Sequence, residues 1–216
     1  MALNQHSLQL LNHCKPKSVL SLGFPDIVVS RQELREITGI DVEGGSIDQQ
    51  KWHGTKESLP DTMEFFAKLG CEFTCVDYKV IRGNEVVADL NFPHSFGEFD
   101  LVIDPGTIEH CFNIATAVIN AAQSVKVGGH IVHVNPVTMV NHGFYNLCPT
   151  FYYDFYLENG FEIVEAFAAL EEMKGAFPHK GRVGYAPEVS AYVLARRLEA
   201  KPFKFPIQAK YARSQG

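Results

Sequence analysis

The sequence predicts an α/β protein of three layers, with helices on both faces of a doubly wound, mostly parallel sheet. The first observation is a strand–helix–strand pattern at residues 99–136, where two apolar runs flank a segment with apolar residues every three or four positions. The second is that these runs do not alternate with polar residues, as is typical of strands buried on both faces. The third is that polar residues follow the strands, where parallel sheets bind ligands.

Seven apolar segments are expected to form the strands, at residues 18–23, 73–76, 85–88, 99–103, 131–134, 161–168 and 190–196. Helices are expected between them, at residues 3–14, 31–37, 61–70, 107–122 and 149–158. Ser30 and Asp61 each precede a glutamate by three positions, which is the spacing of a capping box. The pair Gly128 and Gly129 is expected to end the helix at 107–122. The last two strands are expected to form an antiparallel edge of the sheet.

The composition fits one medium-sized globular domain spanning residues 1–216, since 46% of the residues are hydrophobic and 20% are charged. The net charge is -6 and the body of the chain has no basic cluster, so we expect no nucleic-acid partner. No apolar run approaches the roughly 20 residues of a membrane span, and the first residues lack the pattern of a secretory signal. We therefore expect a cytoplasmic protein without a membrane partner. The sequence leaves the oligomeric state open, a homo-oligomer included.

The five cysteines are odd in number and lie mostly in apolar surroundings, so they are expected to be reduced core residues. Cys71 and Cys75 are close enough in sequence to be considered as metal ligands. Their spacing falls across an expected strand and no second pair follows, so we expect no metal site.

A long connection at residues 38–60 separates the expected second helix from the third. Long connections inside compact domains are uncommon and often act as lids or binding loops. The connection contains Trp52, the only tryptophan, which fits a lid over a substrate as well as a residue that docks a plain loop. The tail at residues 200–216 is basic.

Several motifs, taken in order, resemble the class I methyltransferases that use S-adenosylmethionine (SAM). Residues 19–23, Val-Leu-Ser-Leu-Gly, are similar to the first strand and glycine turn of that family, and this resemblance makes Gly23 a cofactor-binding residue. Asp77 matches the acidic residue that binds the ribose hydroxyls, and a carboxylate at a strand end can accept from two adjacent hydroxyls. Asp89 and Leu90 match the position that contacts the adenine.

The resemblance continues in the second half of the sheet. Residues 99–104 are similar to the fourth strand of the family, which places Asp104 with the cofactor-binding residues, and residues 107–110 are similar to the start of the next helix. Residues 127–131 resemble the glycine pair before the fifth strand. The resemblance implies a methyltransferase that uses SAM as cofactor and transfers a methyl group to a small molecule by a single in-line displacement.

Two other functions stay open. The family loop is usually G-x-G-x-G, but here Pro25 stands where the second glycine is expected, and proline offers no N–H. This departure favours the alternative of a non-catalytic, methyltransferase-like binding subunit. A nicotinamide-dependent oxidoreductase uses a similar sheet, but G-x-G-x-x-G is absent after the first strand.

Histidine suits the role of a base near neutral pH, and two histidines follow expected strands. His142 is the better candidate to act on a substrate, and His110 is the other; packing at a helix start and a surface loop are the structural alternatives. Asn141, Tyr145 and Trp52 are the candidate substrate-binding residues. His133, inside an apolar strand, is expected to be a hydrogen-bonded core residue.

Overall fold

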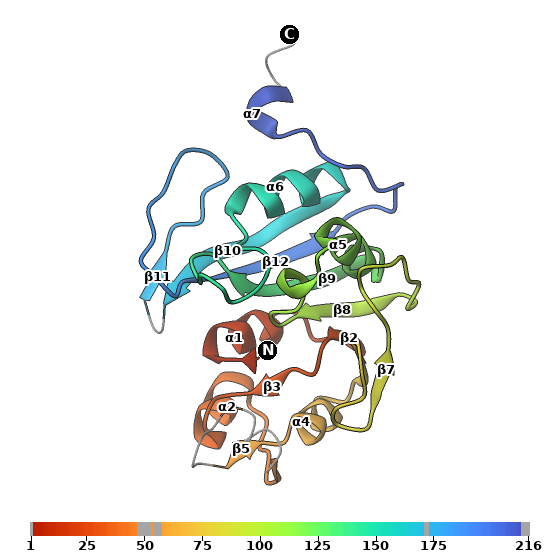
Figure 1. The fold of residues 1–216 in the computed structure, drawn as a ribbon. Coiled ribbons are helices and arrows are strands. Elements are labelled where there is room, and N and C mark those ends of the chain that lie inside the picture. Colours follow the sequence, from red (N-terminus) through yellow and green to blue (C-terminus); the bar gives the residue numbers. More distant parts are fainter. Residues whose placement is uncertain (1, 47–52, 54–57, 171–172, 213–216) are drawn as a thin grey trace.

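An eight-stranded sheet forms the centre of the protein in the computed structural model, which describes residues 2–46, 53, 58–170 and 173–212 (Figure 1). The strand order is β11-β10-β12-β9-β8-β2-β6-β7. The strands are β2 (Ser18–Leu22), β6 (Glu72–Asp77), β7 (Glu85–Val87), β8 (Phe99–Asp104), β9 (Val125–Pro136), β10 (Phe161–Leu170), β11 (Met173–Gly175) and β12 (Ser190–Arg197).

The five strands from β7 to β9 are parallel, as the apolar runs predict. β12 runs antiparallel to both of its neighbours, β9 and β10. The predicted doubly wound, mostly parallel sheet with antiparallel strands at one side is therefore confirmed. It has eight strands instead of seven because β11 adds a short antiparallel strand beside β10.

Helices cover both faces of the sheet, which confirms the three layers (Figure 1). One face carries α1 (Gln5–Asn12), α2 (Arg31–Thr38) and α4 (Thr62–Leu69); the other carries α5 (Ile114–Gln123) and α6 (Pro149–Glu158). A hydrophobic core lies on each face of the sheet. Within β8, Leu101 and Ile103 pack into the core under α1, α2 and α4, and Val102 packs into the core under α5 and α6. Because neighbouring strand residues point to opposite faces, a continuous apolar run supplies both cores.

The remaining elements are short. Two ribbons lie outside the main sheet, formed by β1 (Ala2–Leu3) with β3 (Asp26–Ile27) and by β4 (Gly45–Ser46) with β5 (Leu59–Pro60). The ribbon of β4 and β5 lies in the predicted lid at residues 38–60, and α7 (Ala209–Ala212) lies in the basic tail. No helix in the described ranges is long and apolar enough to cross a membrane.

The helix predicted at residues 107–122 is interrupted. Oδ1 of Asp104 accepts hydrogen bonds from the N–H groups of Thr107 and Ile108, at 2.9 and 3.2 Å, and a short 3-10 helix, η1 (Ile108–His110), follows. α5 then begins after Asn113, whose side chain accepts from the N–H of Thr116.

The prediction that Gly128 and Gly129 end this helix is wrong. α5 ends at Gln123, and the glycine pair lies inside β9, where the register against β8 shifts. A Cβ at Gly129 would lie 2.9 Å from the carbonyl oxygen of Asp100, so glycine is needed here for the close approach of the two strands.

Candidate functional site

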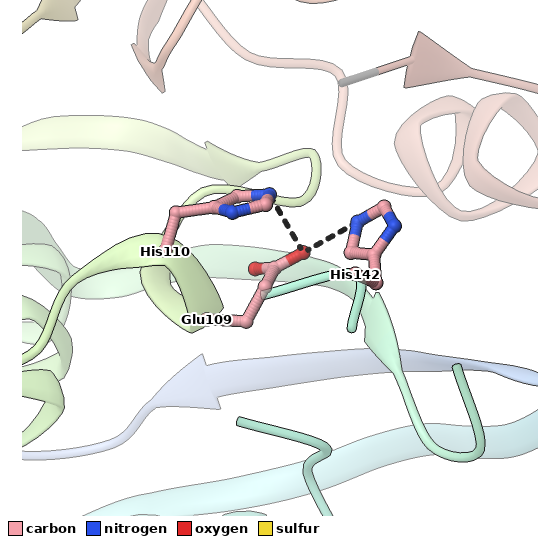
Figure 2. A group of neighbouring side chains, drawn as sticks. All are labelled: Glu109, His110 and His142. Atoms are coloured by element: carbon pink, nitrogen blue, oxygen red, sulfur yellow. Dashed lines mark ion pairs between the residues drawn. The ribbon is translucent and has the colours of Figure 1, made fainter. Parts of the chain in front are cut away.

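The carboxyl ends of β8 and β9 bring together polar side chains from two loops. β8 ends at Asp104, and Glu109 and His110 follow in η1. β9 ends at Pro136, and His142 lies in the next loop. Because neighbouring parallel strands end at the same edge of a sheet, the two loops meet. Glu109, His110 and His142, hereafter the Glu-His-His cluster, face one another there (Figure 2).

Glu109 is the buried member of the cluster. Its side chain has no exposed surface. Oε2 accepts a hydrogen bond from Nδ2 of Asn135 at 2.9 Å, whereas Oε1 has no hydrogen-bond partner in the described part of the chain. Burial, reinforced by the negative charge of Asp104, raises the pKa of Glu109 to about 8. A buried carboxylate oxygen without a donor is costly, so Oε1 is a site where a proton or a cation is favoured.

The two histidines are half-exposed and approach this oxygen. Nε2 of His142 lies 3.6 Å from Oε1 of Glu109, and Nε2 of His110 lies 4.0 Å from it (Figure 2). The ring centroids of the histidines are 5.1 Å apart. Burial, followed by the charge of His142, lowers the pKa of His110. A lowered pKa favours the neutral imidazole, which can accept a proton or bind a metal ion.

Asp104 forms a buried network beneath the cluster. Its side chain has no exposed surface, and Nδ1 of His133 lies 2.6 Å from Oδ2. Nε2 of His133 lies 2.5 Å from the hydroxyl of Tyr156, which is also buried. The prediction that His133 is a hydrogen-bonded core residue is confirmed. Asp104, predicted to bind the cofactor, has both oxygens bonded to protein donors and supports the cluster from within the core.

Asn135 connects this network to Glu109. Its Nδ2 donates to Oδ2 of Asp104 and to Oε2 of Glu109, both at 2.9 Å. The hydroxyl of Tyr152 donates to Oδ1 of Asn135 at 2.6 Å. These bonds fix one oxygen of Glu109, so the other oxygen is held toward the histidines.

The loop after β9 packs directly on Glu109. The N–H of Phe144 donates to the carbonyl oxygen of Glu109 at 2.9 Å. A Cβ at Gly143 would lie 2.9 Å from that oxygen and 3.0 Å from Cγ of Glu109. The missing side chain at Gly143 therefore permits the close approach that places His142 in the cluster.

Two predicted cofactor residues lie at the ends of β2 and β6. Gly23 follows β2 with φ of +81°, and its N–H donates to the carbonyl oxygen of Val76 at 2.6 Å. Asp77 ends β6 and is 7% exposed; Oδ1 accepts from the N–H of Tyr78 at 2.7 Å, and burial raises the pKa of Asp77. The chain leaves β2 toward β6 and later returns to β8 on the other side, which makes this edge a topological switch point, the usual position of a ligand in such sheets.

A charged cluster that sequence reasoning missed covers the turn after Gly23. Asp26 is 2% exposed, and its Oδ2 lies 2.8 Å from Nη2 of Arg82 and 3.0 Å from Nε2 of His53. The guanidinium of Arg82 also lies over the ring of Phe24. Because Arg82 belongs to the loop between β6 and β7, these contacts tie that loop to the turn.

The remaining cofactor candidates follow β7. Asp89 is exposed, and its Oδ1 accepts from the N–H of Asn91 at 2.9 Å, which lowers the pKa of Asp89. Leu90 is buried, and its carbonyl oxygen accepts from Nδ2 of Asn120. Of this pair, only Asp89 has an exposed side chain.

The candidate substrate residues are divided among three places. Asn141 is exposed beside His142 and has φ of +64°. Tyr145 is partly buried, and its hydroxyl donates to the carbonyl oxygen of Phe112 at 2.8 Å, which ties its loop to the segment between η1 and α5. Trp52 lies outside the described residues.

The Glu-His-His cluster is also a candidate metal site, which the sequence analysis did not expect. Its three ligand atoms lie within 4.8 Å of one another, and no other such group occurs in the ranges the structure describes. Cys71, weighed as a ligand from the sequence, is outside it, and burial raises the pKa of its thiol to about 11. The available signal was the adjacent pair Glu109 and His110 after an apolar strand, but sequence does not show which of the two is buried.

No known family matches the sequence, and no curated protein matches it. Several solved structures are similar in fold, and two of them are the following. TehB from Haemophilus influenzae has 13% identity and a TM-score of 0.45, over 87% of this chain and 61% of that chain. The 1,6-didemethyltoxoflavin-N1-methyltransferase of Burkholderia thailandensis, with 1,6-didemethyltoxoflavin and S-adenosylhomocysteine bound, has 12% identity and a TM-score of 0.48, over 90% of this chain and 78% of that chain.

Proposed function

We propose that the protein is a SAM-dependent methyltransferase that acts on a small molecule. The observation that carries this proposal is that two groups of candidate residues lie side by side at the carboxyl ends of the parallel strands. Gly23 and Asp77 lie at the ends of β2 and β6, and the Glu-His-His cluster lies at the ends of β8 and β9. A cofactor in the first half would hold its reactive group beside an acceptor in the second half.

In this proposal Asp77 binds the ribose of SAM. Asp77 ends the strand next to β2 and is 7% exposed, and burial raises its pKa. Asp77→Ala should weaken SAM binding by roughly 1.5–3 kcal/mol, because hydrogen bonds to a charged acceptor are lost. Glu72→Ala, at the other end of the same strand, is the matched control and should leave the affinity unchanged. Calorimetric titration of each folded variant with SAM gives both values.

His142, with His110 as second candidate, acts on the acceptor. In a single displacement the bond from sulfur to the methyl carbon breaks as the acceptor forms its bond to that carbon, and S-adenosylhomocysteine leaves. If the acceptor atom is a hydroxyl oxygen, its proton passes to the imidazole, which is half-exposed and within reach of a molecule at the surface. Labelled SAM incubated with pooled small metabolites should identify the acceptor.

A specific observation favours the alternative of a non-catalytic binding subunit. Three of the four backbone positions of the turn offer no free donor, since the N–H of Gly23 is bonded to Val76, that of Asp26 is bonded to Phe24, and Pro25 has none. A folded wild-type protein that does not bind SAM would reject the methyltransferase and support this alternative.

We also propose a cytoplasmic location, because all five cysteines are free thiols.

A further inference from the structure

We propose that Oε1 of Glu109, Nε2 of His110 and Nε2 of His142 form a binding site for one divalent transition-metal ion. The site is built from a fully buried carboxylate and two half-exposed imidazoles that converge on one point at the sheet edge (Figure 2). The inference stands on these residues alone; only the place of the ion in a reaction rests on the proposed methyl transfer.

The donor set has the chemistry of known metal sites. Two histidines and one glutamate hold catalytic zinc, and two histidines and one carboxylate on one side of the ion hold non-haem iron, in each case with positions left open. In the cluster, the two imidazoles expose 47% and 44% of their surface, for His110 and His142, so the open positions would face solvent or an acceptor.

The geometry requires only a small contraction. Ligand atoms bound at about 2.0–2.2 Å around a tetrahedral ion lie about 3.3 Å from one another. Here Oε1 of Glu109 lies 3.6 Å from Nε2 of His142 and 4.0 Å from Nε2 of His110, and all three ligand atoms lie within 4.8 Å. Half-exposed rings can rotate to close these gaps without disturbing the core.

The second and independent observation is the unpartnered oxygen of Glu109. Oε1 is buried and has no hydrogen-bond partner in the described chain, although it is aimed at the two rings. An oxygen in this state has lost its water without gaining a donor, which is unfavourable. A bound cation would supply the missing contact and the missing positive charge.

Neighbouring residues hold Glu109 in place, as residues around a metal site hold the metal ligands. Oε2 is held by Nδ2 of Asn135, which Tyr152 orients in turn. Gly143 and the N–H of Phe144 hold the backbone of Glu109 against the loop that carries His142. Hydrogen-bonded carboxylate ligands of this kind are usual in metal sites.

The test is the titration of the metal-free protein with Co²⁺, in which binding is measured by calorimetry and by visible absorption. We expect one Co²⁺ per chain and an absorption spectrum of nitrogen and oxygen ligands. Glu109→Gln and His142→Ala should each lower the affinity more than about 10-fold. His13→Ala removes an exposed histidine near the opposite edge of the sheet and should bind Co²⁺ like the wild type.

Circular dichroism and a melting curve show that each variant is folded. No Co²⁺ binding by the folded wild type, or equal affinity in all variants, would overturn the proposal; equal, weak binding would identify an adventitious ion only. SAM binding is measured on the same samples. A folded wild-type protein that binds Co²⁺ but not SAM would reject the proposed function and leave the metal site standing.

Discussion

His142 is the residue whose chemistry depends most on its neighbours. Its ring is 44% exposed, and Nε2 lies 3.6 Å from the buried, unpartnered oxygen of Glu109. In this position the imidazole can take a proton from an acceptor or hold a cation that polarises the acceptor. In the proposed methyl transfer both roles would concern the acceptor, because Gly23 and Asp77, the cofactor candidates at the ends of β2 and β6, lie on the other half of this end of the sheet.

His142→Ala should therefore lower turnover by about 10²–10⁴-fold and leave the affinity for SAM nearly unchanged. Single-turnover kinetics with the identified acceptor, together with calorimetry, separate the two effects. His13→Ala should retain full turnover. If His142→Ala also retained full turnover, the residue would have no catalytic role; if it lost SAM binding alone, it would belong to the cofactor site.

At the residue scale, the sequence predicted side chains whose role follows from their own strand. His133 was correctly expected in the core because its neighbours along the strand are apolar. The burial of Glu109 was not predictable, because it depends on Asn135 and on the packing of Gly143, both more than 20 residues away. Arg82 and Asp26 are 56 residues apart, and no local pattern indicates their contact.

At the scale of elements, periodicity predicted which segments are helical, and the capping spacing at Ser30 correctly predicted the start of α2, but the start of α5 was wrong. The apolar spacing at residues 107–122 continues across a break, since η1 and α5 both pack on the same core. The side chains of Asp104 and Asn113 set the break by accepting backbone hydrogen bonds. Side chains of this kind compete with regular helix, and apolar spacing does not contain that information.

Gly143→Ala tests the packing of the loop after β9. The added Cβ would lie 2.9 Å from the carbonyl oxygen of Glu109, so either the loop or η1 must move. We expect a loss of about 1–3 kcal/mol in the free energy of unfolding in urea, with weaker Co²⁺ binding.

Gly184→Ala is the matched control, because a Cβ there has no atom within 4 Å. Its free energy of unfolding should stay within about 0.5 kcal/mol of the wild type. If Gly143→Ala behaved like this control, the loop would not depend on close packing against Glu109.

At the scale of the molecule, the apolar runs predicted the class of fold, and long-range pairing decided the rest. Runs buried on both faces indicate parallel strands, and five strands are parallel. The position of β12 between β9 and β10 was not predictable, since its order in the sheet depends on contacts across the whole chain. The three-residue strand β11 is too short to give a pattern.

The pair of Arg82 and Asp26 connects the loop after β6 to the turn after β2, across 56 residues of sequence. Arg82→Met should lower the free energy of unfolding by about 3–5 kcal/mol, because it leaves a buried carboxylate without its guanidinium partner. Arg35→Met is the matched control. The ion pair of Arg35 with Asp41 is exposed and 4.0 Å long, so its loss should change stability by less than about 1 kcal/mol. Urea unfolding of both variants measures the two changes. Equal losses in the free energy of unfolding would show that the buried ion pair stabilises the protein no more than the exposed one.

The position of β12 also has a consequence for biosynthesis. β9 and β10 both pair with β12, yet β12 begins at Ser190 and is the last strand of the described chain. Chains emerge from the ribosome amino terminus first, at about 5–20 residues per second. For seconds, therefore, the nascent protein carries two long strands whose shared neighbour has not yet been made, and such open edges invite pairing with other chains. The yield of soluble protein in a cell then depends on how well those edges are shielded until translation passes residue 197.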